Sequence, residues 1–189
     1  KLSEDEKVST IIKVRAHDED NRELFFITKK GIVKKTEGKL FFHINKNGIR
    51  ALTLKGEDDL TYVGLTSGTK KNEVFIATRA GFAIRFSEED VRSMGRTAAG
   101  VKGINLRKDD FVVSAAIVNP ETDLDKLSVL TITDEGYGKR TSLKEYKVQT
   151  RGGKGIINLK VNDKTGKIVD VKIVDNETEI MLITSEGTL

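Results

Sequence analysis

The sequence contains no cysteine, no tryptophan, one proline and two histidines in 189 residues. Without cysteine, disulfide bonds and thiolate metal sites are excluded, which is compatible with a reducing cytosol. No apolar run approaches the roughly 20 residues of a membrane-spanning helix, and residues 1–7 are too charged for a secretion signal. His17 and His43 have no nearby serine or metal-spaced partner, so the sequence offers little support for catalysis or a metal site.

The strongest feature that is present is a hairpin pattern, which recurs four times. Each copy has an apolar run, a Thr-x-x-Gly turn and a second short strand that usually carries a basic residue. The glycines, separated by 50, 55 and 51 residues, are Gly31, Gly81, Gly136 and Gly187. Thr-x-x-Gly between two strands is typical of a type I turn closed by a glycine with positive φ. A period near 50 residues indicates a repeat architecture.

Two further segments recur between the hairpins. One has a glycine six positions before its final leucine, and its copies are residues 47–54, 99–106 and 152–159. The other is an apolar strand after an acidic turn, and its copies are residues 60–65, 111–118 and 168–174. A strand is also expected at residues 7–16, which are rich in β-branched side chains. Single helical turns are expected at residues 87–90 and 142–145, which begin with serine and carry acids.

Four short strands in each period indicate an all-β, propeller-like fold of four-stranded blades. The repeats are predicted at approximately 1–54, 55–106, 107–159 and 160–189, which gives one domain with roughly four blades. The chain begins without methionine, and both ends fall inside repeats. We therefore expect it to be part of a longer protein, with the N-terminal blade and the C-terminal end of the domain missing.

Charge is sorted along the repeats, although the net charge is only +4. Basic residues without intervening acids occur in residues 28–35 and 91–108, and residues 139–154 hold six basic residues and one acid. Acids gather at residues 57–59, 109–125 and 175–179. If the repeats stack or circle, one edge of the fold becomes basic, as a surface that follows a phosphate backbone requires.

This pattern predicts binding of double-stranded DNA through its phosphates, without direct readout of the bases. Aromatic residues make up only 6% of the chain and lie mostly in apolar runs, which argues against base stacking. A curved basic track would bend the duplex at a cost that the ionic contacts offset. The alternative is a solvated surface whose lysines protect strand edges. The residues predicted to contact DNA are Lys29, Lys30, Lys34, Lys35, Arg50, Arg79, Arg85, Arg92, Arg96, Lys102, Lys139, Arg140, Arg151 and Lys154.

Other patterns have simpler explanations than chemistry. The pairs Asp58–Asp59 and Asp109–Asp110 occupy repeat-equivalent turns, where aspartate is favoured by turn geometry. The glycine-rich segments 136–139 and 152–155 lack the strand, Gly-x4-Gly-Lys-Ser/Thr sequence and helix of a nucleotide-binding loop. No cofactor is therefore predicted for this chain.

Several strings resemble the C-terminal domain of the A subunit of DNA gyrase, a type IIA topoisomerase. They are Met94 to Ile104, Glu135 to Thr141, Tyr146 to Ile156, Gly31 to Thr36 and Ala83 to Phe86. The resemblance covers essentially the whole chain. It implies a β-pinwheel, a propeller-like disc that has six blades in the complete domain. It also implies a basic rim that wraps DNA, presents a crossing segment to the catalytic core and so supports ATP-dependent negative supercoiling.

The family carries a basic glycine heptad, Gln-Arg-Arg-Gly-Gly-Lys-Gly, in its first blade. Residues 149–155 match it at six of seven positions and differ only at Thr150, and by position they belong to a later blade. The box-like residues are Gln149, Arg151, Gly152, Gly153, Lys154 and Gly155. The glycines would let the backbone approach a phosphate closely, while the basic residues supply charge.

The resemblance implies partners besides DNA, namely the B subunit of gyrase and the N-terminal core of the A subunit. ATP and Mg²⁺ would be used elsewhere in that isomerase, no membrane partner is expected, and the location would be the bacterial cytoplasm at the nucleoid. The DNA-cleaving tyrosine of the family lies in its N-terminal region. Tyr62, Tyr137 and Tyr146 lack the arginine that precedes it, so this chain is expected to be non-catalytic.

Two alternatives stay open. The C-terminal domain of the C subunit of topoisomerase IV would bind DNA similarly but steer substrate choice without a strong supercoiling wrap, and the box-like heptad favours gyrase over it. A propeller scaffold for protein partners would carry its basic rim only for solubility. The rim hypothesis predicts that Lys34→Glu with Lys35→Glu weakens duplex binding irrespective of sequence.

Overall fold

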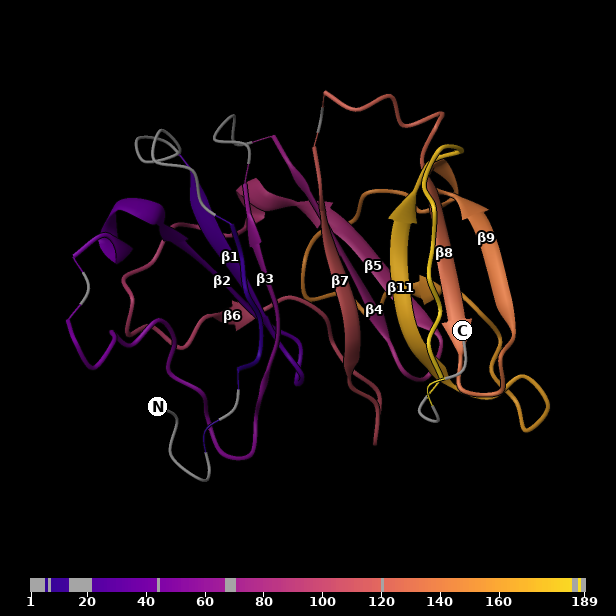
Figure 1. The fold of residues 1–189 in the computed structure, drawn as a ribbon, viewed down its shortest axis with the longest axis horizontal. Coiled ribbons are helices and arrows are strands. Elements are labelled where there is room, and N and C mark those ends of the chain that lie inside the picture. Colours follow the sequence, from indigo (N-terminus) through magenta and orange to yellow (C-terminus); the bar gives the residue numbers. More distant parts are fainter. Residues whose placement is uncertain are drawn as a thin grey trace.

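The protein is all-β, as the repeats predicted, and the described residues form antiparallel sheets that lie side by side as blades (Figure 1). The computed structural model describes residues 6, 8–13, 22–43, 45–66, 71–119, 121–184 and 187. Within them, blade 1 has the strand order β3-β1-β2-β6, blade 2 the order β10-β5-β4-β7 and blade 3 the order β11-β8-β9.

Each blade is built on one of the predicted hairpins. Blade 1 consists of β1 (Glu23–Thr28), β2 (Ile32–Glu37), β3 (Leu60–Leu65) and β6 (Val101–Lys102). Blade 2 consists of β4 (Glu73–Thr78), β5 (Phe82–Ser87), β7 (Val112–Val118) and β10 (Ile156–Ile157). Blade 3 consists of β8 (Ser128–Thr133), β9 (Gly138–Ser142) and β11 (Ile168–Val174).

A short 3-10 turn follows each hairpin. The turns are η1 (Gly38–Phe41), η2 (Glu88–Asp90) and η3 (Leu143–Glu145). The hydroxyl groups of Ser87 and Ser142 accept the amides of Glu89 and Lys144 at 3.2 and 3.4 Å. These serine caps start η2 and η3 and confirm the two helical turns that the sequence predicted.

The Thr-x-x-Gly turns form as predicted, and their hydrogen bonds explain why threonine recurs. Gly31, at φ +77°, donates its amide to the carbonyl oxygen of Thr28 at 2.9 Å. The Thr28 hydroxyl accepts the amide of Ile32 at 3.1 Å, which closes the turn from the other side. The same pair of bonds recurs at Thr78 and Thr133.

A blade is not one sequence repeat, because its outermost strand comes from the next repeat. Strand β6 follows the hairpin of blade 2 in the chain but pairs with β2 of blade 1, and β10, from the repeat of blade 3, pairs with β5 of blade 2. We call the segments that carry these strands strap 2 (residues 91–106) and strap 3 (residues 146–161), and the equivalent residues 45–54 strap 1. The blades are therefore linked by exchanged strands as well as by packing.

The straps align differently from the sequence expectation, which matched Gly100 with Gly153. Val101 pairs with Val33 and Ile156 pairs with Ala83, so the counterpart of Gly100 is Gly155. Both glycines have positive φ, and a Cβ added to them would lie 2.5 Å from the Val33 carbonyl oxygen and 2.4 Å from that of Ala83. The 55-residue interval between the second and third hairpins thus applies to the straps too.

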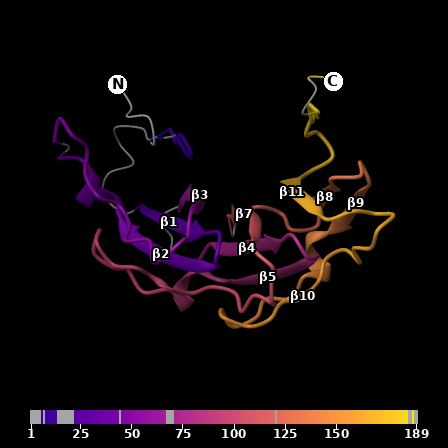
Figure 2. The same cartoon turned by 90° about the horizontal axis from the view of Figure 1, so that it is seen from below.

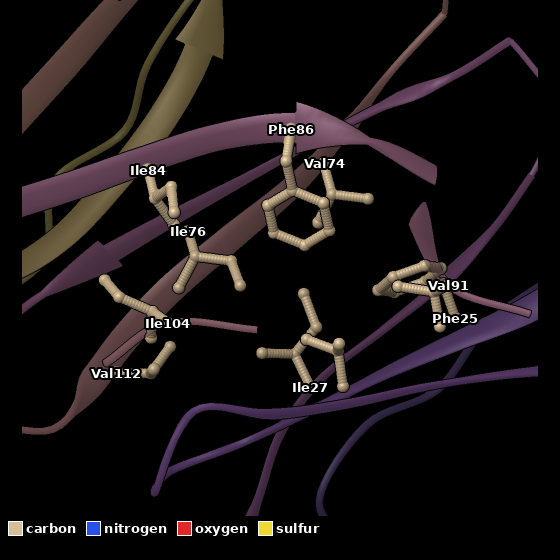
Figure 3. Close-up of a cluster of buried hydrophobic side chains, with 10 residues drawn as sticks. Phe25, Ile27, Val74, Ile76, Ile84, Phe86, Val91, Ile104 and Val112 are labelled. Atoms are coloured by element: carbon tan, nitrogen blue, oxygen red, sulfur yellow. The ribbon is translucent and has the colours of Figure 1, made fainter. Parts of the chain in front are cut away.

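Two apolar clusters between the blades hold the structure together. Phe25 of blade 1 and Phe86 of blade 2 belong to the first cluster (Figure 3). Phe75 of blade 2 and Val129 of blade 3 belong to the second. Blade 2 is covered on both faces, which explains the nearly continuous apolar run of β4. Each large apolar side chain that is fully buried contributes about 1.5–3 kcal/mol.

The two outermost predicted strands do not form over the residues that the structure describes. Residues 8–13 and 178–184 are not paired into any sheet of the described chain, and residues 7 and 14–16 lie outside the described residues. Ile12 packs on the outer face of blade 1. Residues 180–184 and the outer face of blade 3 line a pocket of about 740 Å³. Gly187 donates its amide to the Thr184 carbonyl oxygen at 2.9 Å, the same bond that the other three turns make, and residues 185, 186, 188 and 189 of the predicted fourth hairpin lie outside the described residues.

Candidate nucleic-acid interface

Three of the residues predicted to contact DNA are buried. Lys34, Lys35 and Arg85 expose 0%, 5% and 4% of their surface. Side chains this deeply buried cannot reach a phosphate without leaving their sites, so the prediction that these three lie on a DNA-facing rim is wrong. The sequence showed that the second strand of the hairpin repeatedly carries a base, but not that neighbouring segments cover it.

Lys34 fastens strap 1 to strap 2. Its Nζ donates to the carbonyl oxygen of Ala51 in strap 1 and to that of Arg96 in strap 2. It also lies 5.4 Å from the centroid of the Phe26 ring. Burial, with a smaller contribution from the charge of Arg96, lowers the pKa of Lys34 from 10.5 to about 8.

Lys35 and Arg85 occupy equivalent positions, opposite Phe25 and Phe75 in their hairpins. The Lys35 Nζ lies 3.3 Å from a carboxylate oxygen of Glu23 and donates to the carbonyl oxygen of Glu88 at 3.3 Å. Glu88 belongs to η2, so the bond crosses from blade 1 to the turn after the hairpin of blade 2. We call this arrangement, a base paired with an acid of its own blade and bonded to the next 3-10 turn, an inter-blade clamp.

The clamp at Arg85 makes more bonds than the one at Lys35. Arg85 pairs with Glu73 of its own blade, with its Nε 2.5 Å from a carboxylate oxygen. One terminal nitrogen donates to the carbonyl oxygens of Leu143 and Tyr146 at 3.0 and 3.1 Å. These carbonyls lie in and directly after η3, so the clamp joins blade 2 to blade 3.

Three predicted residues are half-buried and partly engaged within the protein: Arg79, Arg96 and Arg151. Arg79 lies 2.6 Å from the carboxylate of Asp134 and donates to the Ile168 carbonyl oxygen at 3.3 Å. The amide of Lys167 and, to a smaller extent, Arg79 lower the pKa of Asp134. Arg151 donates to the carbonyl oxygens of Asp90 and Lys102 at 2.8 and 3.0 Å. Arg79 and Arg151 therefore hold blades and straps together and offer only part of their charge to a ligand.

The remaining predicted residues are exposed: Lys29, Lys30, Arg50, Arg92, Lys102, Lys139, Arg140 and Lys154. Arg50, Lys102 and Lys154 place one exposed cation on each of the three straps. The Thr53 hydroxyl of strap 1 donates to the Thr97 carbonyl oxygen of strap 2 at 2.6 Å, and Gly152 of strap 3 donates its amide to the strap 2 carbonyl oxygen of Gly103, also at 2.6 Å. The straps thus form one connected layer. Figure 2 shows straps 2 and 3 on the convex side of the row of blades.

The box-like segment lies in strap 3 and has a structural role. Gln149 donates its amide to the Arg85 carbonyl oxygen at 2.7 Å. Gly155 has to be a glycine because its backbone approaches Ala83, and Gly152 has φ +77°. Gly153 accepts the amide of Asn105 at 2.8 Å. The close approach that these glycines allow is therefore to neighbouring strands, while the side chain of Lys154 remains exposed.

The predicted DNA contacts left out several exposed cations that lie in or next to the straps. Arg107, directly after strap 2, lies 3.1 Å from the centroid of the Phe82 ring and donates to the Lys154 carbonyl oxygen at 3.0 Å. Its counterpart 55 residues later is Asn162, so the basic residue is not repeated at this position. Lys108, Lys147 and Lys160 are also exposed in or next to the straps.

The acidic turns have the role that the sequence predicted. Asp58 accepts the amide of Lys30 at 2.8 Å, and Asp110 accepts that of Ala80 at the same distance. Both carboxylates therefore brace a hairpin turn. The described part of the chain holds no group of three or more His, Cys, Asp and Glu residues that could bind a metal ion. Nor does any helix there have the length and apolarity of a membrane span.

The fold defines a propeller-type domain whose antiparallel blades exchange their outermost strands and whose straps carry exposed cations. The DNA gyrase C-terminal domain, beta-propeller family matches residues 22–67, 72–119 and 128–175. These segments contain the hairpin and the following strand of each of the three blades. The chain belongs to this family.

The relatives of the chain agree with this assignment. The A subunit of DNA gyrase from Lawsonia intracellularis is 45% identical over 188 residues, which cover 100% of this chain and 22% of that protein. The crystal structure of the C-terminal domain of DNA topoisomerase IV has a TM-score of 0.82 and 30% identity over 93% of this chain and 53% of that one. The DNA gyrase A C-terminal domain has a TM-score of 0.70 and 26% identity over 82% and 50%. The chain thus spans about a fifth of its curated relative.

Proposed function

We propose that this chain is a DNA-wrapping part of the A subunit of DNA gyrase. It binds double-stranded DNA through phosphates along the layer of straps and bends the duplex around their convex side. The observation that carries this proposal is the exposed cation on each of the three hydrogen-bonded straps, at Arg50, Lys102 and Lys154. Lys102 and Lys154 do not occupy matching positions, because the residue 55 positions after Lys102 is Ile157. An exposed cation on each strap of a curved layer nevertheless suits a phosphate backbone, which presents one charge per about 1.7 Å of duplex.

Ionic contacts of this kind fit binding without base readout. Each neutralised phosphate releases counterions, so affinity falls with salt and does not depend on sequence. Bending 20–30 base pairs costs on the order of 1–6 kcal/mol, which the ionic interactions along the straps offset. The predicted contacts that remain for this role are the exposed residues, with partial contributions from Arg79, Arg96 and Arg151.

In the intact enzyme, the wrapped duplex would be presented to the N-terminal core of the A subunit, while the B subunit supplies ATP-driven motion. This chain would be a non-catalytic part of a type II topoisomerase in the bacterial cytoplasm, and ATP and Mg²⁺ would act on other parts of the enzyme. This chain covers 22% of the A subunit of DNA gyrase from L. intracellularis, so most of the length of that subunit lies outside it.

A second candidate is the corresponding domain of topoisomerase IV, which is favoured by the TM-score of 0.82. It would bind DNA along the same straps but impose a weaker wrap. Relaxation and ligation of circular DNA in the presence of the chain separates the two, because the linking-number shift grows with the extent of the wrap and a weaker wrap leaves a smaller shift. Absence of duplex binding at low salt would favour the scaffold alternative, and duplex binding that persists at high salt would contradict binding through phosphates.

The contact proposal is tested with Lys102→Glu combined with Lys154→Glu. Fluorescence anisotropy on two duplexes of unrelated sequence should show affinity reduced at least tenfold for both, and a salt slope reduced by about 0.9 per lost contact. Lys172→Glu is the matched control, because Lys172 is 64% exposed but lies on β11, outside the straps. Equal effects of the control and the strap variant would contradict the proposal. Lys34→Glu with Lys35→Glu is unsuitable, because it would disrupt buried contacts.

A further inference from the structure

We propose that the inter-blade clamps at Lys35 and Arg85 are positioning elements that set the angle between blades and thereby the curvature imposed on bound DNA. The inference rests on the proposed function, because curvature of the straps matters to DNA only if the duplex lies on them. Neither residue touches the duplex in this arrangement, since both side chains are buried.

The clamps hold the point where each strap begins. The Lys35 side chain bonds η2 through Glu88, and the Lys35 carbonyl oxygen accepts the amide of Met94 in strap 2 at 2.8 Å. Arg85 repeats this pattern, with side-chain bonds to Leu143 and Tyr146, and its carbonyl oxygen accepts the amide of Gln149 in strap 3. Each clamp residue therefore fixes the 3-10 turn and the first residues of the next strap together.

Hydrogen bonds are directional and can fix the angle between two blades, which apolar packing alone leaves variable. The clusters between the blades are held by hydrophobic contact, which is non-directional and depends mainly on buried area. A charged hydrogen bond has a preferred distance and angle, and the acid on the same blade orients the base that donates it. The planar guanidinium of Arg85 reaches Glu73 and two carbonyl oxygens at once, so it restricts rotation at its junction more than the ammonium of Lys35 does.

The third copy of the position shows what the clamp requires. Arg140 lies opposite Leu130, as Arg85 lies opposite Phe75. The acid position of blade 3 is Ser128, and the Arg140 guanidinium bonds Asn176 at 2.7 Å instead of a 3-10 turn. Among the described residues Arg140 has neither an acid at this position nor a neighbouring 3-10 turn, and it is exposed, so burial of the base accompanies a complete clamp there.

The blade angle is measured first without DNA. Because the chain has no cysteine, Lys39→Cys and Lys144→Cys, which are exposed sites on η1 and η3, can carry a pair of spin labels. The clamp is removed by Arg85→Met with Glu73→Met, so that neither partner stays buried and unpaired. We expect a distance distribution at least twice as wide as in the unaltered chain. Arg85→Lys should restore a narrow distribution, since Lys35 shows that an ammonium serves at this position.

The second set of measurements uses DNA and determines the duplex affinity and the linking-number shift. Affinity for a 20-base-pair duplex should stay within threefold of the unaltered chain, because no exposed cation is removed. The linking-number shift after relaxation and ligation should fall at least threefold and return in Arg85→Lys. Lys172→Met is the matched control, because it removes one exposed cation outside both clamp and straps; both readouts should stay near those of the unaltered chain.

The outcomes separate the two proposals. An unchanged distance distribution in the Arg85→Met, Glu73→Met chain would overturn the clamp inference, whatever DNA does. A widened distribution with an unchanged linking-number shift would overturn the link to curvature. If the unaltered chain bound no duplex at low salt, the proposed function would fail, and the spin-label distances alone would decide whether the clamp sets the blade angle.

Discussion

The junction between blades 2 and 3 and the outer face of blade 3 present the same hairpin position in two environments. At the junction, Arg85 is 4% exposed and bonded to Glu73 and to the turn of blade 3. On the outer face, Arg140 is exposed and bonds only Asn176 among the described residues. The difference teaches that a repeated basic residue is not by itself a surface feature: a neighbouring blade converts it into a structural contact.

The surroundings of the two hairpins differ in the same way. Gly81 turns toward strap 3, where an added Cβ would lie 2.1 Å from the Leu159 carbonyl oxygen. Gly136, at the same position in blade 3, has no atom within 4 Å of an added Cβ. Both have positive φ, so they share the backbone requirement and differ only in packing.

The largest expected effect comes from replacing each of these two glycines with alanine, which tests the difference in their packing. Gly136→Ala should cost about 1–2 kcal/mol, because alanine disfavours positive φ. Gly81→Ala should cost about 4 kcal/mol, because the clash with the backbone of strap 3 adds an overpacking term of about 1–3 kcal/mol. Urea unfolding measures both. Equal losses would mean that strap 3 does not press on the turn of blade 2.

The next effect concerns the buried base. Arg85→Met should lower the free energy of unfolding by about 3 kcal/mol, because it leaves Glu73 partly buried without its partner. Arg140→Met should change it by less than about 0.5 kcal/mol, as expected for an exposed site. The same urea titrations give both values, and a large loss for Arg140→Met would show that blade 3 is covered in solution.

A smaller, stabilising effect is expected at a buried polar pair. Asn72 and Glu88 are 1% and 0% exposed, and Asn72 Oδ1 and Glu88 Oε2 have no hydrogen-bond partner. The equivalent residues beside blade 3 are Leu127 and Leu143, linked by the same backbone bond. Asn72→Leu with Glu88→Leu should therefore raise the thermal midpoint and stabilise the chain by about 1–2 kcal/mol. A lowered thermal midpoint would show that water molecules satisfy the hydrogen bonds of Asn72 and Glu88.

The smallest effect is a pH dependence at Lys34. Its pKa is about 8 in the folded chain and 10.5 without burial, so the unfolded chain binds more protons between these values. Stability from this group therefore rises with pH in that window and is reduced below it. Lys34→Ile mimics Ile84, the residue at this position in blade 2. The stability of the unaltered chain relative to the variant should increase from about pH 7.5 to 9.5; a flat difference would contradict the shifted pKa.

The elements inside each repeat could be predicted from local patterns. The Thr-x-x-Gly turns and the serine-capped turns depend on residues within a few positions, as the bonds at Thr28 and Ser87 show. The strand expected at residues 7–16 does not form over the described residues 8–13, because β propensity forms a strand only where a partner pairs with it. The match of Gly100 with Gly155 also required the pairing register of the exchanged strands.

Of the candidate site, only the positive charge could be predicted from the sequence. The sequence identified the basic segments, but it could not separate Lys35, buried under η2, from Lys102, exposed on strap 2. It also missed Arg107, whose stacking on Phe82 joins residues far apart in the chain.

The sequence by itself determined the repeat, the hairpin turns, the all-β class and the family, because these follow from the order of side chains along each local segment. Only the tertiary structure decided which cations are clamps and which are free for a ligand. The physical reason is that burial of a base depends on the blade and strap packed against it, and these come from the next repeat.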